Sequence, residues 1–170
     1  MNKHNLKILI LLSIILLCTS CDLSTKWLAK QHLEHARPIT IIQNIFEFRY
    51  TENEAIAFSM LLSVDPKLRK WLIYSLSLIA LTFLSILTWQ VRNDSLWWLV
   101  SLMLIFSGAI GNLLERLARG YVIDFIYFHY YDRWSWPIFN VADILITCGA
   151  ILLGILMLRK SPESALTTQK

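Results

Sequence analysis

Two uncharged stretches decide the fold: WLIYSLSLIALTFLSILTWQV at 71–91 and SLWWLVSLMLIFSGAIGNLL at 95–114. Each has about the 20 residues that an α-helix needs to cross a hydrocarbon core of ~30 Å. The bilayer core offers no water to the backbone, so such stretches must satisfy their own hydrogen bonds and form helices. The short link of Arg92, Asn93 and Asp94 joins them tightly. The centre of the chain therefore predicts two consecutive membrane spans.

The composition is also that of a membrane protein. Of the 170 residues, 56% are hydrophobic, and the mean hydropathy is +0.52, which is more apolar than soluble domains of this size. The formal net charge of +4 comes without a basic run interleaved with aromatics, so it favours contact with anionic lipid head groups over nucleic acid. Cys18, Cys21 and Cys148 lie within apolar runs and form a poor disulfide framework.

Two further spans carry charged residues. The first includes Asp22 and Lys26, and their i, i+4 spacing with the acid first favours an ion pair on a helix. The last begins after Pro137, a favourable first-turn residue, and has Asp143 in its early turns. The expected spans are therefore about 8–29, 71–91, 95–117 and 138–158.

A polar segment separates the first two spans. Its middle, FEFRYT at 46–51, alternates with the period of a half-buried strand, so we expect a small β ribbon over about 38–58 at the membrane surface. The stretch 119–136 is dense in aromatics, which belong at the head-group level. The expected fold class is mainly α, with four transmembrane helices and this ribbon. It forms one membrane domain over 1–160, followed by a polar tail over 161–170.

The orientation follows from the N-terminal tail. Four spans place both termini on one side, and Lys3 and Lys7 have no acid near them, so the positive-inside rule places that side in the cytoplasm. The whole-chain count disagrees, because ten of the 16 Lys and Arg residues would lie outside. We give the tail more weight, since several of those ten occupy folded positions where topology signals weaken.

Ionisable side chains in membrane helices are costly and usually functional, and the expected topology brings several of them to one membrane face. Asp124 lies in YVIDFI and Asp143 in FNVADIL. Two carboxylates held close in a low dielectric cannot both ionise, so they share a proton. The ionised member can take a proton from water while the protonated member polarises a carbonyl. The ionisable residues near this face are Asp22, Lys26, Glu115, Arg116, Asp124 and Asp143.

A structural interpretation stays open from the residues alone, in which Asp124 caps a turn and Asp143 caps or pairs at a helix start. Arg116 could neutralise a carboxylate or bind a lipid head group. Asn112 could join two helices by a hydrogen bond, and Asn140 is the remaining polar residue near this face. The four histidines show no ligand spacing, and no Ser-His-Asp grouping is visible, so we expect neither a metal nor another cofactor.

Five short motifs lie in order along the chain: DLSTK at 22–26, NEAIAF at 53–58, GNLLER at 111–116, GYVIDF at 120–125 and FNVAD at 139–143. They resemble the patterns D-x-x-x-K, N-x-G-x-A-F, G-N-x-x-[DE]-R, G-x-V-x-D-F and F-N-x-A-D of the lipoprotein signal peptidase family, also called signal peptidase II. The resemblance covers most of the chain.

The resemblance implies an aspartic endopeptidase that removes signal peptides from prolipoproteins by cleaving before the diacylglyceryl-modified cysteine. Carried over by position, Asp124 and Asp143 are the catalytic pair, and Asp22 and Lys26 are a structural pair. The residues implied to support the substrate or the catalytic pair are Asn53, Asn112, Arg116 and Asn140.

The resemblance also implies a setting and partners. The expected partners are diacylglyceryl-modified prolipoproteins and membrane lipid, with no nucleic acid, and we expect a monomer. The site would lie near the periplasmic face of the bacterial inner membrane, with both termini cytoplasmic. One residue departs from the pattern: Ala55 stands where the family has glycine. If that position needs a positive φ, alanine costs energy there and changes the loop or the substrate preference.

Three other interpretations remain. The chain could itself be a lipoprotein precursor lipidated at Cys21, but three more spans follow where a soluble domain is expected. It could be a transporter that uses its intramembrane acids, but these cluster at one face. It could also be an inactive relative that binds lipidated peptides without cutting them, although both aspartates are present.

Overall fold

Four long helices make up most of the chain. The computed structural model describes residues 3–54 and 65–159, and within them each helix is long and apolar enough to cross a membrane. This confirms the expected fold class. The first helix is longer than its expected span at both ends. The helices are α1 (Lys3–Leu33), α2 (Pro66–Gln90), α3 (Leu96–Arg119) and α4 (Val141–Arg159).

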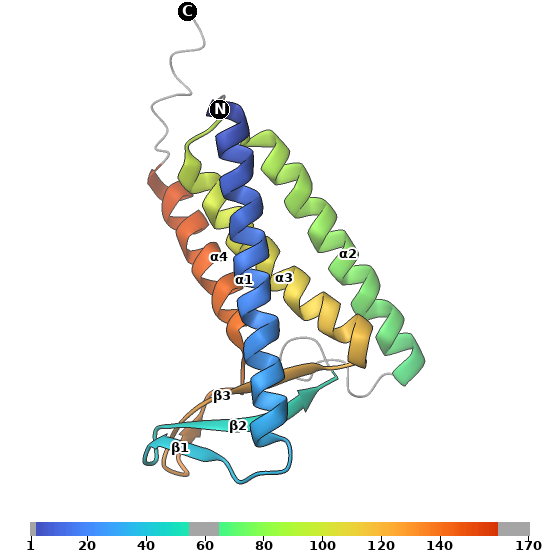
Figure 1. The fold of residues 1–170 in the computed structure, drawn as a ribbon, viewed down its shortest axis with the longest axis vertical. Coiled ribbons are helices and arrows are strands. Elements are labelled where there is room, and N and C mark those ends of the chain that lie inside the picture. Colours follow the sequence, from blue (N-terminus) through green and yellow to red (C-terminus); the bar gives the residue numbers. More distant parts are fainter. Residues whose placement is uncertain (1–2, 55–64, 160–170) are drawn as a thin grey trace, which may run out of the picture.

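A four-stranded antiparallel sheet lies at one end of the bundle (Figure 1). Two of its strands occupy the expected ribbon, while the other two fall in the aromatic stretch that we assigned only to the head-group level. The last residues of the expected ribbon, 55–58, lie outside the described residues, and Ala55 is one of them. The expected tail over 161–170 also lies outside the described residues. The strands are β1 (Ile39–Ile42), β2 (Phe46–Asn53), β3 (Val122–Tyr130) and β4 (Trp134–Ser135), paired in that order.

The strand β3 forms because its sequence, VIDFIYFHY, is rich in β-branched and aromatic residues. The alternation that marks a strand is missing, since every residue from 122 to 126 is buried. One side of this segment packs on Ala29 and Leu33 of α1, and its backbone pairs with β2. The central position of β3 in the sheet therefore hides its period in the sequence.

Helix α4 begins at Val141, later than the expected start after Pro137. The backbone of Phe139 is already engaged with β3: its N–H donates to Ile126 O at 3.0 Å, and its carbonyl accepts from Ile126 N at 2.8 Å. Because Phe139 is held in this bridge, it cannot be the first residue of a helix. Helix α4 therefore begins only after Asn140.

Helix α3 is the central element and contacts each of the other helices. Two glycines allow the closest approaches. A Cβ on Gly111 would collide with the carboxylate of Asp22 in α1, and one on Gly108 would collide with the carbonyl oxygen of Ala142 in α4. Small residues at such crossings are typical of membrane helices, because they let backbones approach closely.

The two ends of the molecule differ. The start of α1, the turn between α2 and α3, and the end of α4 lie together at the end opposite the sheet (Figure 1). There Lys7 Nζ donates to the carbonyl oxygen of Arg92 at 2.7 Å. The polar residues singled out from the sequence gather at the other end, where three helices meet the sheet.

Candidate active site

Asp124 is the third residue of β3. It pairs in the antiparallel register with Thr51 of β2, and only 3% of it is exposed. Its carboxylate accepts two amide hydrogen bonds, from Asn53 Nδ2 at 2.8 Å and from Asn140 Nδ2 at 2.6 Å. Asp124 therefore does not cap a turn, and each of its oxygens is held by a side chain from a different segment.

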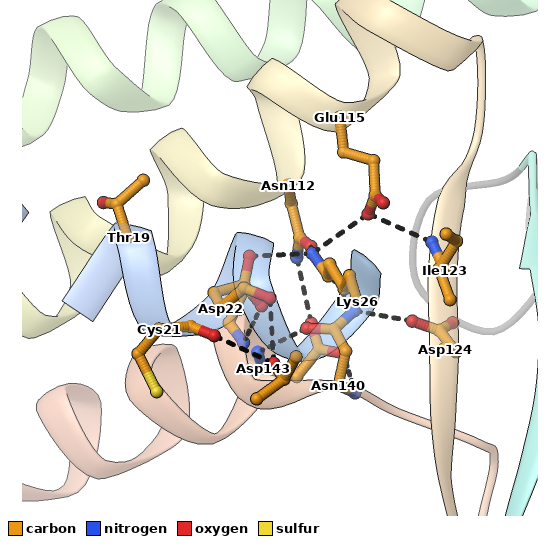
Figure 2. Close-up of polar contacts among 12 residues, drawn as sticks. Thr19, Cys21, Asp22, Lys26, Asn112, Glu115, Ile123, Asp124, Asn140 and Asp143 are labelled. Carbon is orange, nitrogen blue, oxygen red and sulfur yellow. Dashed lines mark hydrogen bonds and ion pairs between the residues drawn. The ribbon is translucent and has the colours of Figure 1, made fainter. Parts of the chain in front are cut away.

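Asp143 lies in the first turn of α4 and forms a reciprocal cap with Asn140. The backbone N–H of Asn140 donates to Asp143 Oδ2, and the N–H of Asp143 donates to Asn140 Oδ1, both at 3.1 Å. This is the arrangement of a capping box. Because Asn140 also donates to Asp124, one residue connects the two aspartates, as Figure 2 shows.

Asn112 of α3 holds the remaining oxygen of Asp143. Its Nδ2 donates to Asp143 Oδ1 at 3.1 Å, and its Oδ1 accepts from Lys26 Nζ at 2.7 Å. A lysine ammonium only donates hydrogen bonds, so Lys26 fixes the amide oxygen toward itself. The amide nitrogen of Asn112 then faces Asp143. Lys26 therefore orients the hydrogen bond from Asn112 to Asp143 without taking part in it.

A fully buried ion cluster lies behind the aspartates. Lys26 Nζ is 2.9 Å from Asp22 Oδ2 and 3.2 Å from Glu115 Oε2. Asp22 Oδ1 accepts from the backbone N–H of Ala142 at 2.8 Å, and Glu115 Oε2 accepts from that of Ile123 at 3.1 Å. The two backbone N–H donors belong to the residues directly before Asp143 and Asp124. The cluster therefore connects α1 and α3 to both segments that carry the aspartates (Figure 2).

Arg116 of α3 stands beside this arrangement. Its positive charge interacts with both Asp124 and Asp143. Its backbone carbonyl accepts from Tyr74 of α2 at 3.0 Å and from the N–H of Gly120 at 2.9 Å. Gly120 ends α3 in the left-handed conformation, with φ of 89°, which glycine adopts without strain.

The environment of the aspartates favours acid–base chemistry. Burial raises the pKa of Asp124 to about 6, and the charge of Asp143 adds to the rise, whereas the hydrogen bonds from Asn53 and Asn140 oppose it. A carboxyl group with a pKa near 6 can gain and lose a proton close to the working pH of an enzyme, as acid–base catalysis requires. Within residues 3–54 and 65–159, no three His, Cys, Asp or Glu side chains are grouped so as to hold a metal ion.

The site residues expected from the sequence lie together at the sheet end of the bundle. Glu115 is the residue that sequence reasoning left out of the site, although it was among the ionisable candidates. Its position in the sequence could have indicated its role, because it lies one helical turn beyond Gly111 and Asn112 on α3. Its hydrogen bond to β3 could not be anticipated, because the sequence analysis did not predict that strand.

Fold and site together define a polytopic membrane protein with two closely connected aspartates at one end of its helices. The family model for signal peptidase (SPase) II matches residues 14–159. The lipoprotein signal peptidase of Clostridium tetani is 37% identical over 153 residues, covering 90% of this chain and 92% of that protein. That of Geobacter metallireducens is 38% identical over 138 residues, covering 81% and 83%. The chain belongs to the signal peptidase II family.

Solved structures agree with this assignment. A bacterial membrane enzyme determined by the in meso method at 2.3 Å resolution superposes with a TM-score of 0.75 at 25% sequence identity, covering 95% of this chain and 92% of that one. A second such structure, at 1.9 Å resolution, gives a TM-score of 0.74.

Proposed function

We propose that this protein cleaves lipoprotein precursors before their diacylglyceryl-modified cysteine, with Asp124 and Asp143 as the catalytic pair. The observation that carries the proposal is the connection of the two carboxylates through Asn140, which donates to Asp124 while forming a cap with Asp143. The helix-capping contact of Asp143 is thus part of the same arrangement and does not compete with a catalytic role.

The chemistry follows from the shared proton. Asp124, buried and with its pKa raised to about 6, carries the proton and donates it toward the carbonyl oxygen of the scissile bond. The ionised partner takes a proton from water, which attacks the carbonyl carbon. The tetrahedral intermediate then collapses: the C–N bond breaks as the partner's proton passes to the leaving amine. Asp124 takes back a proton from a hydroxyl of the intermediate, so the pair returns to its singly protonated state. Asn53, Asn112 and Asn140 keep the carboxylates in place, and Arg116 supplies a positive charge beside them.

The proposed setting is the bacterial inner membrane, with both termini in the cytoplasm and the site near the periplasmic face. The N-terminal lysines support this orientation. Lys26, one of the cations that weigh against it, is fully buried in an ion cluster and so carries little topology signal. We further propose that residues 1–160 act as one peptidase domain, working as a monomer in contact with membrane lipid, and that 161–170 is a tail.

Two of the other interpretations lose support from the geometry. α1 runs unbroken through Cys21, and the residues on both sides of that position are engaged: Thr19 donates to Ser107 O at 3.2 Å and Asp22 pairs with Lys26. Cleavage before Cys21 would separate the helix from its packed remainder. An ion or proton path uses ionisable groups along the depth of the membrane, whereas the buried charged residues in the described part of the chain all lie at the sheet end.

The test is a comparison of two substrates in detergent micelles. The purified protein is given one precursor with, and the same precursor without, the diacylglyceryl group, and the products are measured by mass spectrometry. We expect a cut directly before the lipid-bearing cysteine in the modified precursor, and none in the unmodified one. Binding of the modified precursor without any cut would support the inactive relative instead.

A further inference from the structure

A cavity lies between the start of α2 and the end of α3. Both helix ends lie on the sheet side of the bundle (Figure 1). The volume of the cavity is about 200 Å³. The described residues that line it include three cations and a single carboxylate, which is a strongly positive setting for so small a space. They are Glu54, Arg69, Lys70, Ile73, Tyr74, Arg116 and Gly120.

The cations of the cavity are held by specific contacts. Arg69 pairs with Glu54 across 2.5 Å, and the arginine side chain is only 12% exposed, compared with 58% for the glutamate. Lys70 Nζ lies 5.8 Å from the ring centroid of Tyr74. Because the hydroxyl of Tyr74 donates to the backbone carbonyl of Arg116, the wall of the cavity is built jointly by α2 and α3.

The helix turn that carries these cations also carries apolar side chains at the surface. Leu68 is 54% exposed and Trp71 is 64% exposed, at the start of a helix long and apolar enough to span a membrane. An exposed tryptophan at the end of a span marks the depth of the lipid head groups. The cavity thus lies where the phosphates of the surrounding leaflet lie.

We propose that this cavity binds the phosphate of an anionic phospholipid from the surrounding leaflet. Basic pockets between membrane helices are a known physical solution for holding anionic head groups, and an arginine side chain suits a phosphate because it can donate two parallel hydrogen bonds. The site is distinct from the aspartate pair, although Arg116 contributes to both.

Glu54 sets the affinity of this site. Its carboxylate already occupies Arg69, so an incoming phosphate must displace it or share the guanidinium with it. Removing the negative charge of Glu54 frees Arg69 and makes the cavity more positive. The proposal therefore predicts two opposite effects on lipid affinity. Loss of the cations weakens lipid binding, and loss of the glutamate charge strengthens it.

The experiment measures bound lipid directly and uses no peptide substrate, so its result is independent of the proposed peptidase function. The full chain is placed in nanodiscs of phosphatidylcholine with a minor share of phosphatidylglycerol, then released into detergent, and retained lipid is identified by native mass spectrometry. We expect wild type to retain phosphatidylglycerol selectively. In the double variant Arg69→Gln, Lys70→Gln the affinity falls by about tenfold or more, and in Glu54→Gln it rises.

Lys67→Gln is the matched control, because Lys67 is an exposed cation of the same helix turn that does not line the cavity. Its lipid retention stays at the wild-type value. Thermal melts in phosphatidylcholine alone confirm that each variant is folded.

Three results would overturn the proposal. The first is equal retention of the two lipids by wild type. The second is an unchanged phosphatidylglycerol affinity in both the double variant and Glu54→Gln. The third is that inorganic phosphate displaces phosphatidylglycerol and, in the absence of this lipid, stabilises the protein against heat as much as the lipid does. The ligand of the cavity would then be a free anion.

Discussion

Asp124 shows how a single residue acquires its chemistry from its surroundings. It is an ordinary carboxylate in the sequence, but the strand that carries it is buried on both sides, and this burial is the main reason that its pKa rises to about 6. The amides of Asn53 and Asn140 lower the cost of ionisation without cancelling it. A group in this balance can exchange a proton within the working range of an enzyme.

The raised pKa predicts a pH dependence of stability with a definite sign. The folded state holds the proton of Asp124 more tightly than the unfolded state does, so this residue stabilises the fold below its ordinary pKa. That contribution is lost as the pH rises toward 6. As the pH rises from about 3 to about 7, wild type should lose about 3 kcal/mol of unfolding free energy relative to Asp124→Asn. Denaturant titrations in mixed micelles at several pH values measure this difference, and a gap that does not change with pH would contradict it.

At the scale of elements, the buried ion cluster joins the helices to the sheet. Lys26 of α1 neutralises Asp22 of its own helix and Glu115 of α3. Each of these acids accepts a backbone N–H from the residue directly before one of the two aspartates of the proposed catalytic pair. We therefore expect stability and activity to depend together on this one cation.

Lys26→Met should destabilise the protein by about 3–5 kcal/mol, because it removes the buried cation that two buried carboxylates share. It also releases the amide of Asn112, so activity should fall even where the variant is folded. Lys30→Met is the matched control, since Lys30 lies one turn further along α1 and pairs with Glu34 at the surface, with both side chains about a quarter exposed. Thermal melts in detergent compare the two variants. Equal losses in both would show that the buried cluster has no special role.

The sequence predicted some elements well and others poorly, for identifiable reasons. The uncharged runs that became α2 and α3 were clear, because length and the absence of charge are enough to indicate a span. Strand β3 was missed, because burial on both faces removes the alternation that reveals a strand. The start of α4 was predicted too early, because Pro137 is a favourable first residue, whereas the bridge between Phe139 and Ile126 is a tertiary contact.

The candidate site shows the same division. The aspartates and asparagines were found through short motifs that resemble those of a family, and the i, i+4 spacing identified the pair of Asp22 and Lys26. The role of Glu115 depends on the N–H of Ile123 in β3, so it could not be found before that strand was known. Local patterns thus indicated the candidate reacting groups, and the tertiary fold was needed to explain what holds them.

At the scale of the whole molecule, the two ends of the bundle are chemically different. The sheet end carries the aspartate pair and the buried ion cluster, and the opposite end carries the turn between α2 and α3 with the start of α1 (Figure 1). The proposed orientation places the aspartate pair where water and lipid-anchored peptide meet, which suits a peptidase whose substrate arrives within the bilayer.

The proposed orientation can be tested by labelling. In a background without Cys18, Cys21 and Cys148, single cysteines are introduced as Asn93→Cys in the turn between α2 and α3 and as Ser135→Cys in β4, both exposed positions. A membrane-impermeant maleimide added to spheroplasts should label the second and leave the first unlabelled until the membrane is permeabilised. The reverse pattern would place the site in the cytoplasm.

The catalytic role of the two aspartates is the central claim, and one measurement tests it most directly. Cleavage of a diacylglyceryl-modified precursor in micelles is compared among wild type, Asp124→Asn and Asp143→Asn, each shown to be folded by a thermal melt. Because neither asparagine can exchange the shared proton, we expect each variant to lose at least about a thousandfold in kcat. If either folded variant cleaves at close to the wild-type rate, that aspartate only caps or packs, and the aspartic-peptidase mechanism is wrong for this site.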